Sequence, residues 1–524
     1  MWEDSDDDMV LLKHKPRLVR RYRRKNVLIP LAAIILLILF IYLPTSASSW
    51  SEPAIFRTSP ADRHQRPTTP LVKVQATFWR SLYSTILNND PKCDKLPEKV
   101  VPQQLAIPYN HNQARTRPDI LWMDAPDIRR MKEAHSNFIS DLRLTQPKMP
   151  YVNGSRGIVT TAGIDQLPVL TISLRMLRRT GCRLPVEVFL ASYEEYDEDV
   201  CENILPALGA ECMILKDIYR AANTGVNIHK YQYKIMSILF STFEDVLLLD
   251  ADAFPIYDPT ILFDKEPFTS TGLVLWPDFW YASESPYYFQ ITKLDPPQLH
   301  ERPSTESGEI LYSKPKHETS IMLASYYNYY GPDYYYPLQS QGAPGQGDKE
   351  TFGWAAAAMG EPFYAVHESV IALGRRDSNG EFAGSAMAQH DPVADFRRIN
   401  SASTREEAQF ESAQTKGEID LIAEDNGVRP FFVHANYPKF DPATIFQREI
   451  WGARGPTMDS NGTVTRCWME QKEAIEVFGY DLEHRFWQEI KEVACGYEHR
   501  FLAWRYQEGL CTKVKKYWEQ VFEA

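Results

Sequence analysis

The sequence has few cysteines, no excess of positive charge and only one long hydrophobic run. Its 7 cysteines include no pair with CxxC spacing, and no cluster of cysteine and histidine predicts a structural zinc site. The formal net charge is −12 at pH 7, from 57 Lys and Arg against 69 Asp and Glu. A general nucleic-acid binder normally has a basic footprint, so this balance argues against nucleic acid as a partner.

Familiar nucleotide-binding signatures are also missing. The 524 residues contain neither a GxGxxG pattern nor a Walker motif, which excludes the Rossmann dinucleotide and P-loop classes. Hydrophobic residues at 44% and charged residues at 24% are ordinary for a globular protein, so a wholly disordered or fibrous chain is excluded. The chain is long enough for a large buried core and for several domains.

The single long hydrophobic run, Val27–Leu43, predicts a membrane span. Its 17 uncharged residues are at the short end of the range for a spanning helix and suit the thinner early secretory membranes. Basic residues precede it, namely Lys13, Lys15, Arg17, Arg20, Arg21, Arg23, Arg24 and Lys25. The positive-inside rule therefore predicts a cytosolic tail at 1–26, a signal anchor at 27–43 and a lumenal remainder. A cleaved signal peptide is the alternative, although the run is longer than a usual signal-peptide core.

The predicted lumenal part divides by composition at about residue 150. Residues 44–150 begin with many prolines, serines and threonines and are interpreted as a stem and neck, with helix-like stretches that end the stem or lead into the main domain. Residues 151–524 are the expected main domain, with a helical C-terminal part. Asn153 and Asn461 lie in N-glycosylation sequons. Seven cysteines permit disulfides and leave one over, but their pairing stays open.

From residue 151 onward, short hydrophobic runs alternate with helix-like segments. Strands are expected at 157–162, 186–190, 211–215 and 246–249, and helices at 167–179, 197–208 and 231–243. Such alternation predicts an α/β domain with a parallel sheet. The polar residues 399–428 are expected to form an exposed insertion.

The strongest chemical signal is EDVLLLDADAFPIYDP, in which a hydrophobic strand ends in Asp250 and Asp252. Ligands of open α/β sheets bind beyond the carboxyl ends of the strands, where these carboxylates would lie. Two carboxylates at i and i+2 can hold one hard divalent cation, which in turn can bind a diphosphate. A phosphatase with the first aspartate as nucleophile is an alternative, but its motif usually has Thr or Val where Phe254 stands.

Longer stretches resemble a known enzyme family. YQYKIMSILFSTFEDVLLLDADAFPIYDPTILFD looks like the donor-site segment of GT-A fold glycosyltransferases. Residues 304–352, together with FFVHANYPKFDP, resemble fungal Golgi α-1,2-mannosyltransferases of glycosyltransferase family 71, which branch the outer-chain mannan of N-glycans. The resemblance covers roughly residues 150–445.

This resemblance implies a GT-A-like, Rossmann-type mixed sheet flanked by helices, in a Golgi membrane protein of type II. It implies GDP-mannose as donor, Mn²⁺ or a similar cation as cofactor, a glycoprotein glycan as acceptor and a retaining transfer that gives an α linkage. It leaves open a complex with other mannosyltransferases. Transfer of α-1,3-mannose or of mannosyl phosphate, or a catalytically silent lumenal lectin, are the alternatives.

Several residues can be assigned expected roles at the donor. His434 follows a hydrophobic run and is expected to complete the metal shell, with His390 as the rival candidate. Lys439 and Lys234 are expected near the diphosphate, although Lys234 also suits a solvated helix position. The strand end formed by Thr160, Thr161 and Ala162 resembles a nucleotide-facing loop.

Two acids and a group of aromatic residues are expected around the reacting sugars. Asp348 and Glu306 are candidates for contacts to sugar hydroxyls or to a developing oxocarbenium ion, and Asp348 also suits a helix N-cap. The acceptor candidates are Trp276, Asp278 and Trp280 after another short strand, and Tyr334 in YYNYYGPDYYY. A packed wall under the Gly-Pro turn is the alternative for the tyrosines.

Overall fold

The computed structural model describes residues 68–97, 105–376, 380, 382–411, 427–450 and 453–523. The predicted tail, the predicted membrane span and the first part of the predicted stem lie outside the described residues. In the part of the chain that is described, no helix combines the length and the apolar character that a bilayer span requires.

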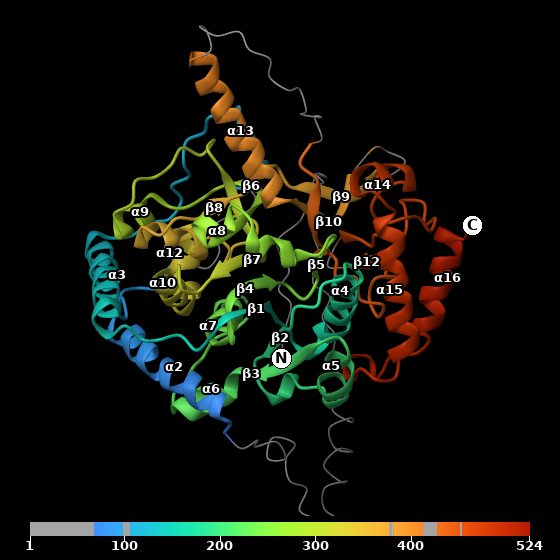
Figure 1. The fold of residues 1–524 in the computed structure, drawn as a ribbon, viewed down its shortest axis with the longest axis horizontal. Coiled ribbons are helices and arrows are strands. Elements are labelled where there is room, and N and C mark those ends of the chain that lie inside the picture. The colour runs from blue at the N-terminus through green and yellow to red at the C-terminus, as the bar shows by residue number, and fades with distance from the viewer. Residues whose placement is uncertain are drawn as a thin grey trace, which may run out of the picture. The chain divides into compact units, whose positions relative to one another are not determined.

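A seven-stranded mixed sheet forms the centre of the domain (Figure 1). Its strands, in spatial order, are β3 (Ala210–Ile214), β2 (Val186–Leu190), β1 (Val152–Thr161), β4 (Phe243–Leu249), β7 (Pro303–Ser313), β6 (Leu273–Tyr281) and β8 (Tyr364–Ala365). Strands β3, β2, β1 and β4 are mutually parallel, whereas β7 runs antiparallel to both β4 and β6. The α/β prediction is confirmed, and the antiparallel β7 makes the sheet mixed.

The strands are hydrophobic along both faces because each face packs against a layer of helices. In β4, Val246 and Leu248 belong to one core, whereas Leu247 and Leu249 belong to the other. The first core includes residues of α2 (Pro70–Asn88), α3 (Ala125–Thr145), α6 (Leu215–Ala222), α7 (Gln232–Phe240), α9 (Pro286–Thr292), α10 (Glu318–Tyr329), α11 (Tyr336–Ser340) and α12 (Thr351–Met359). The second includes residues of α4 (Leu167–Arg179), α5 (Leu205–Ala207), α8 (Phe268–Thr271), α13 (Pro392–Glu411), α14 (Gln471–Phe478), α15 (Leu482–Tyr497) and α16 (Leu510–Phe522).

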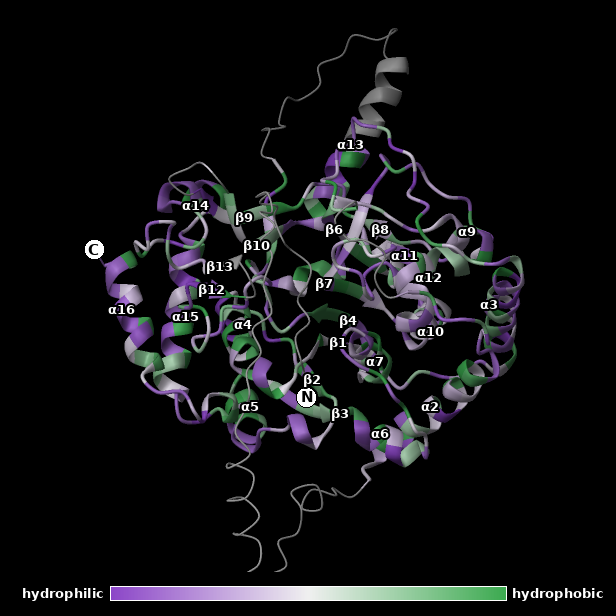
Figure 2. Cartoon of the chain, turned by 180° about the vertical axis from the view of Figure 1, so that it is seen from behind, coloured by the Kyte–Doolittle hydropathy of each residue, from purple (hydrophilic) through white to green (hydrophobic). Residues whose placement is uncertain are grey.

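The colouring in Figure 2 follows this layering, since β2 and β4 are green with hydrophobic residues while the outer helix α16 mixes purple and green. The sequence prediction is confirmed to the residue for α4 and β2. The expected helix at 197–208 is confirmed as a continuous helical segment at 198–207, in which a π-helical turn, Val200–Ile204, leads into the short α5. Pro206 has no N–H, and the disulfide Cys201–Cys212 ties this segment to β3.

A second sheet of four antiparallel strands lies beyond the carboxyl end of β4. Its order is β5 (Ala253–Pro255), β11 (Pro430–His434), β10 (Phe382–His390) and β9 (Ile371–Arg376). Strand β5 follows directly after the two aspartates, and its pairing with β11 sets His434 opposite Ala253. A short hairpin of β12 (Glu449–Ile450) and β13 (Ala453–Arg454) follows later in the chain.

The neck helices are part of the main core. On α2, Trp79 and Leu82 are completely buried, and Phe138 of α3 stacks on Tyr326 of α10. Residues 68–97 and 105–150 thus pack with the α/β sheet in one unit. The C-terminal segment contains a second disulfide, Cys495–Cys511. Cys93, Cys182 and Cys467 are free thiols.

Candidate active site

A cluster of charged side chains lies at the carboxyl end of β4. In the sheet order, β1 and β4 are the central parallel pair from which the connections leave in opposite directions, and such a switch point leaves a crevice for ligands. Val159 pairs with Leu248, so Thr160 and Thr161 follow at the same edge as Asp250. The hydroxyl of Thr160 is buried and has no hydrogen-bond partner among the described residues.

The second sheet brings His434 onto the two aspartates. The Ala435 backbone N–H donates to the Asp252 carbonyl at 2.9 Å, which holds the end of β11 against the turn. The His434 Nε2 atom lies 3.1 Å from Asp252 Oδ1 and 3.8 Å from Asp250 Oδ2. The three predicted metal ligands therefore converge, although His434 is 182 residues away from Asp252 in the chain.

Two lysines flank these carboxylates. Lys439 Nζ lies 2.8 Å from Asp252 Oδ2, and Lys234 Nζ lies 2.8 Å from Asp250 Oδ2. Lys234 also donates to the backbone carbonyl and the hydroxyl of Ser307, each at 3.1 Å. Lys234 is buried, so the solvated-helix alternative for it is wrong.

Strand β7 forms the floor of the cluster. Glu306 Oε1 lies 3.3 Å from His434 Nδ1, while Glu306 Oε2 accepts the Gly308 N–H at 2.5 Å. A Cβ atom on Gly308 would lie 2.4 Å from His434 Nδ1, so the absence of a side chain there lets the imidazole enter. Glu306 in turn orients the ring with its Nε2 atom toward the aspartates.

Asp348 reaches the cluster from the turn before α12. Its side chain accepts from the Ser307 hydroxyl at 3.3 Å and lies 4.0 Å from Lys234 Nζ. Only its backbone carbonyl contacts the start of α12, through Thr351. The N-cap alternative for the Asp348 side chain is therefore wrong. The next residue, Lys349, pairs with Asp278 at 2.7 Å.

Acidic groups outnumber basic groups in the cluster. Five carboxylates, those of Asp250, Asp252, Glu306, Glu309 and Asp348, accompany two lysines and one imidazole. Both oxygens of the fully buried Glu309 have no hydrogen-bond partner among the described residues. A buried carboxylate without a partner is costly when ionised, so Glu309 favours its neutral form unless a cation binds beside it.

The electrostatic shifts follow from this crowding. Burial would raise the pKa of Asp252, but Lys439 and His434 hold it well below its usual range. Burial would likewise raise the pKa of Glu306, yet His434 and Lys234 lower it to about 2. Burial and the neighbouring Glu306 raise the pKa of Glu309 well above its ordinary value. Burial also raises the pKa of Asp348 to about 6, against the opposing effect of Lys234.

The donor set fits a divalent metal. One ligand atom from each of Asp250, Asp252 and His434 can be chosen so that all three lie within 4.8 Å of one another. Two carboxylate oxygens and one imidazole nitrogen suit Mn²⁺ or a similar ion, which accepts both oxygen and nitrogen ligands. The rival His390 is not in this group, because it lies at the end of β10, where its carbonyl accepts from the Trp276 indole.

The acceptor candidates divide into two kinds. Asp278 and Trp280 lie at the carboxyl end of β6, where Asp278 pairs with Lys349, and their roles stay predictions. Trp276 is completely buried and stacks edge-on against Phe432, so its side chain offers no surface to a sugar. Tyr334 is also buried, and its hydroxyl donates to the Cys93 carbonyl. The side chains of Trp276 and Tyr334 pack in the core, which contradicts the acceptor role predicted for them.

Other residues of the site had no clear sequence signal. Glu309 and Ser307 flank Gly308 in the ESGEI segment, and only Glu306 stood out there as an acid. Glu309 is buried because of the strand register, which pairs it with Leu249 at the end of β4. Both sequon asparagines, Asn153 and Asn461, are exposed, and their glycosylation stays a prediction.

Comparison with known proteins decides the family. A family model with the description "Mannosyltransferase putative" matches residues 155–302 and 297–391. The alpha-1,2-mannosyltransferase MNN2 of Saccharomyces cerevisiae is 30% identical over 456 residues, which are 76% of this chain and 74% of that protein. The chain belongs to this mannosyltransferase family.

A second relative of this mannosyltransferase is the alpha-1,2-mannosyltransferase MNN21 of Candida albicans, which is 33% identical over 426 residues. That match spans 72% of the present chain but only 63% of MNN21, less than two thirds of its length. Among solved structures, the galactosyltransferase LgtC matches at 15% identity with a TM-score of 0.28, over 40% of this chain and 73% of that chain. At that TM-score the likeness carries no argument about the fold or the site.

Proposed function

We propose that this protein transfers mannose from GDP-mannose to a mannose hydroxyl of a glycoprotein glycan and forms an α-1,2 linkage. Family membership supports the mannosyl chemistry, and the named relatives are α-1,2-mannosyltransferases. The observation that carries the proposal is the convergence of Asp250, Asp252 and His434 at the switch point of the sheet. A pure lectin has no need of such a cluster.

Asp250, Asp252 and His434 would hold Mn²⁺ or a similar ion. When bound, that ion neutralises negative charge on the donor diphosphate and on the leaving GDP. Lys234 and Lys439 place two ammonium groups beside the same carboxylates, where they add positive charge around the leaving group. The Thr160 hydroxyl, buried at the end of β1, is a donor available to the nucleotide.

Asp348 and Ser307 lie beside Lys234. The Ser307 hydroxyl donates to Asp348 and accepts from Lys234, whose Nζ lies 4.0 Å from Asp348, so this carboxylate has a fixed position in the cluster and is the proposed contact of the donor sugar. From the family resemblance we propose a retaining transfer, in which the acceptor oxygen attacks the face that GDP leaves. The departing phosphate then takes the acceptor proton, and no side-chain base is needed.

The GT-A assignment and the cellular setting belong to the same proposal. The mixed sheet with acids after its central strand supports a GT-A-like domain. The uncharged run 27–43 with basic residues before it supports a type II Golgi membrane protein, with residues 68–523 in the lumen. The predicted partner is therefore a glycan on a protein that passes through the same compartment.

The test is a transfer assay with the full chain purified in detergent. The protein is incubated with Mn²⁺, α-mannobiose and a panel of GDP- and UDP-sugars, and products are followed by mass and linkage analysis. We expect one hexose to be added from GDP-mannose alone, through an α-1,2 bond. A different donor or linkage would overturn that part of the proposal. No product from any donor, together with no Mn²⁺-dependent binding of GDP, would overturn it as a whole.

A further inference from the structure

Tyr231 places an exposed aromatic ring at the edge of the charged cluster. It directly precedes α7 with helical backbone angles (φ −57°, ψ −27°), and the Lys234 backbone N–H donates to its carbonyl at 3.1 Å. Residues three positions apart on a helix lie on the same face. From that face Lys234 reaches Asp250 at 2.8 Å. Tyr231 therefore lies one helical turn from a residue of the site.

The Tyr231 ring also packs on the turn that carries Asp348. A Cβ atom on Gly347 would lie 2.8 Å from Tyr231 Cδ2 and 3.2 Å from Tyr231 Cε2, so the ring covers the Gly347 backbone. The next residue is Asp348, which accepts from the Ser307 hydroxyl and lies 4.0 Å from Lys234 Nζ. Tyr231 is thus joined to the cluster from two directions, through α7 and through this turn.

The order of the strands relates this position to the sugar part of the donor. Strands β1, β4 and β7 are neighbours in the sheet. Thr160 lies at the end of β1, Asp250 follows β4, and Ser307 lies on β7. A donor with its nucleotide at β1 and its diphosphate at Asp250 extends its mannose toward β7, where Ser307 contacts Asp348. Tyr231 lies against the turn on that side.

Burial separates the place of the donor sugar from that of the acceptor. Asp348 is 2% exposed, whereas Tyr231 is 41% exposed. The donor mannose is linked to the diphosphate and reaches the buried carboxylate, while an acceptor glycan enters from solvent and meets the exposed ring. An aromatic face can pack against the apolar C–H face of a pyranose, and the phenol hydroxyl can bond to a sugar hydroxyl.

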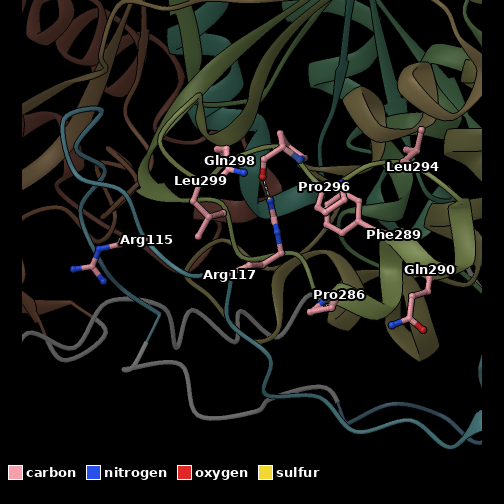
Figure 3. Close-up of a pocket in the computed structure, with 10 residues that line it drawn as sticks. Arg115, Arg117, Pro286, Phe289, Gln290, Leu294, Pro296, Gln298 and Leu299 are labelled. Carbon is pink, nitrogen blue, oxygen red and sulfur yellow. Dashed lines mark hydrogen bonds between the residues drawn. The ribbon is translucent and has the colours of Figure 1, made fainter.

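Phe289, Trp276 and Tyr334 do not offer such a face. Phe289 lines the cavity of about 440 Å³ that Figure 3 shows, but it is buried, and the Arg117 guanidinium lies 4.7 Å above the centre of its ring. Trp276 and Tyr334 are buried in the core. Tyr231 combines exposure with a place beside Asp348, which points to the substrate of the site.

We propose that Tyr231 is an acceptor-contact residue whose ring stacks on the mannose that receives the new sugar. The inference rests on the proposed function and adds to it a residue that determines how the acceptor binds. A stack that is present before and during the reaction stabilises the bound acceptor and the transition state equally. Its loss therefore raises the KM for the acceptor and leaves kcat unchanged.

The first experiment compares Tyr231→Ala and Tyr231→Phe in the full chain with α-mannobiose and GDP-mannose. We expect Tyr231→Ala to raise the KM for α-mannobiose about tenfold, because an aromatic contact is lost. The KM for GDP-mannose should not change, and Tyr231→Phe, which keeps the ring, should behave as the wild type. Tyr506→Ala, at an exposed tyrosine of the C-terminal segment, is the control. A higher KM for GDP-mannose, or equal losses in the Ala and Phe variants, would overturn the stack on the acceptor.

Gly347→Ala displaces the ring instead of removing it. The added methyl group would lie 2.8 Å from Tyr231 Cδ2, and Gly347 is not in the left-handed region, so its backbone accepts alanine. We expect this change to raise the KM for α-mannobiose in the wild-type background and to add nothing in the Tyr231→Ala background, where no ring is left to displace. An equal rise in both backgrounds would overturn the placement of the ring.

Binding of the acceptor separates this inference from the proposed function. Calorimetric titration of α-mannobiose into the full chain, with GDP and Mn²⁺ present, requires no transfer. We expect binding that Tyr231→Ala weakens about tenfold and Tyr506→Ala leaves unchanged. If no donor supports transfer, the proposed function fails, and this titration still decides the role of Tyr231. No binding of α-mannobiose to the wild type, or equal affinity in Tyr231→Ala, would overturn the inference.

Discussion

Two buried polar regions of this protein differ in how many of their polar atoms have hydrogen-bond partners. The tyrosine-rich segment 326–336 is buried, yet its hydroxyls mostly have partners: Tyr326 donates to Asn89, Tyr330 to Ile86, Tyr334 to Cys93 and Tyr336 to Asn328. Among these tyrosines, only the hydroxyl of Tyr335 has no partner in the described part of the chain.

The charged cluster at the end of β4 shows the opposite. It collects five carboxylates, leaves both oxygens of Glu309 without a hydrogen-bond partner in the described residues, and brings His434 within reach of three acids. Packing alone does not account for such an arrangement, because a buried acid without a hydrogen-bond partner destabilises the fold. In this protein the tyrosine hydroxyls with partners belong to the core, whereas the acid without a partner lies in the candidate ligand site.

Removal of divalent cations should affect the charged cluster and leave the tyrosine segment unchanged, and it should have the largest effect on activity. We expect chelation with EDTA to abolish transfer from GDP-mannose, because without a cation the carboxylates repel the donor diphosphate. Mn²⁺ added back in excess should restore the rate, and the tyrosine segment should keep its near-ultraviolet circular dichroism throughout. Full activity in the chelated protein would contradict a metal-dependent cluster.

Asp252→Asn should lower the transfer rate by about 10³-fold, the scale of losing one charged group that stabilises the leaving diphosphate. The rate is measured with α-mannobiose, and Mn²⁺ affinity is measured separately by electron paramagnetic resonance. Asp264→Asn, at an exposed position that pairs with Arg156, is the matched control and should keep the wild-type rate. Unchanged Mn²⁺ affinity in Asp252→Asn would show that Asp252 is not a ligand.

Gly308→Ala should weaken Mn²⁺ binding by about 10- to 100-fold, the range seen when a group that orients a metal ligand is disturbed. The new methyl group would lie 2.4 Å from His434 Nδ1 and 2.8 Å from Glu306 Oε2, so the imidazole must turn away. Gly496→Ala is the control, since nothing lies within 4 Å of its added Cβ atom. Equal Mn²⁺ affinity in both variants would show that the position of the His434 ring does not depend on the missing side chain at Gly308.

Tyr326→Phe should have the smallest effect, and only on stability. It removes the hydrogen bond from the hydroxyl to the Asn89 carbonyl at 2.8 Å, which should lower the free energy of unfolding by about 1 kcal/mol. The transfer rate at a temperature well below the melting point should not change. The measurement is denaturant unfolding, with the exposed Tyr506→Phe as the control. A loss of activity without a loss of stability would place this segment in the site after all.

Local patterns in the sequence predicted much of the fold. The hydrophobic face of α4 and the short, mostly hydrophobic run of β2 were recognisable because their residues repeat with the period of a helix or fill a buried strand. The helix at 198–207 was recognisable too, but its π-helical turn, Val200–Ile204, has no signal in the local pattern. The antiparallel direction of β7 also has no local signal, because strand direction is set by contacts across the sheet.

The α/β class, the position of Asp250 and Asp252 at a strand end, and the resemblance to mannosyltransferases could be predicted from neighbours in the chain. The pairing of distant strands was needed to show that His434, and not His390, reaches the aspartates. It was also needed to show that Trp276 and Tyr334 are buried in the core and that Glu309 has no hydrogen-bond partner in the described residues. Those outcomes depend on which strands pair and in which register, which are properties of contacts between residues far apart in sequence.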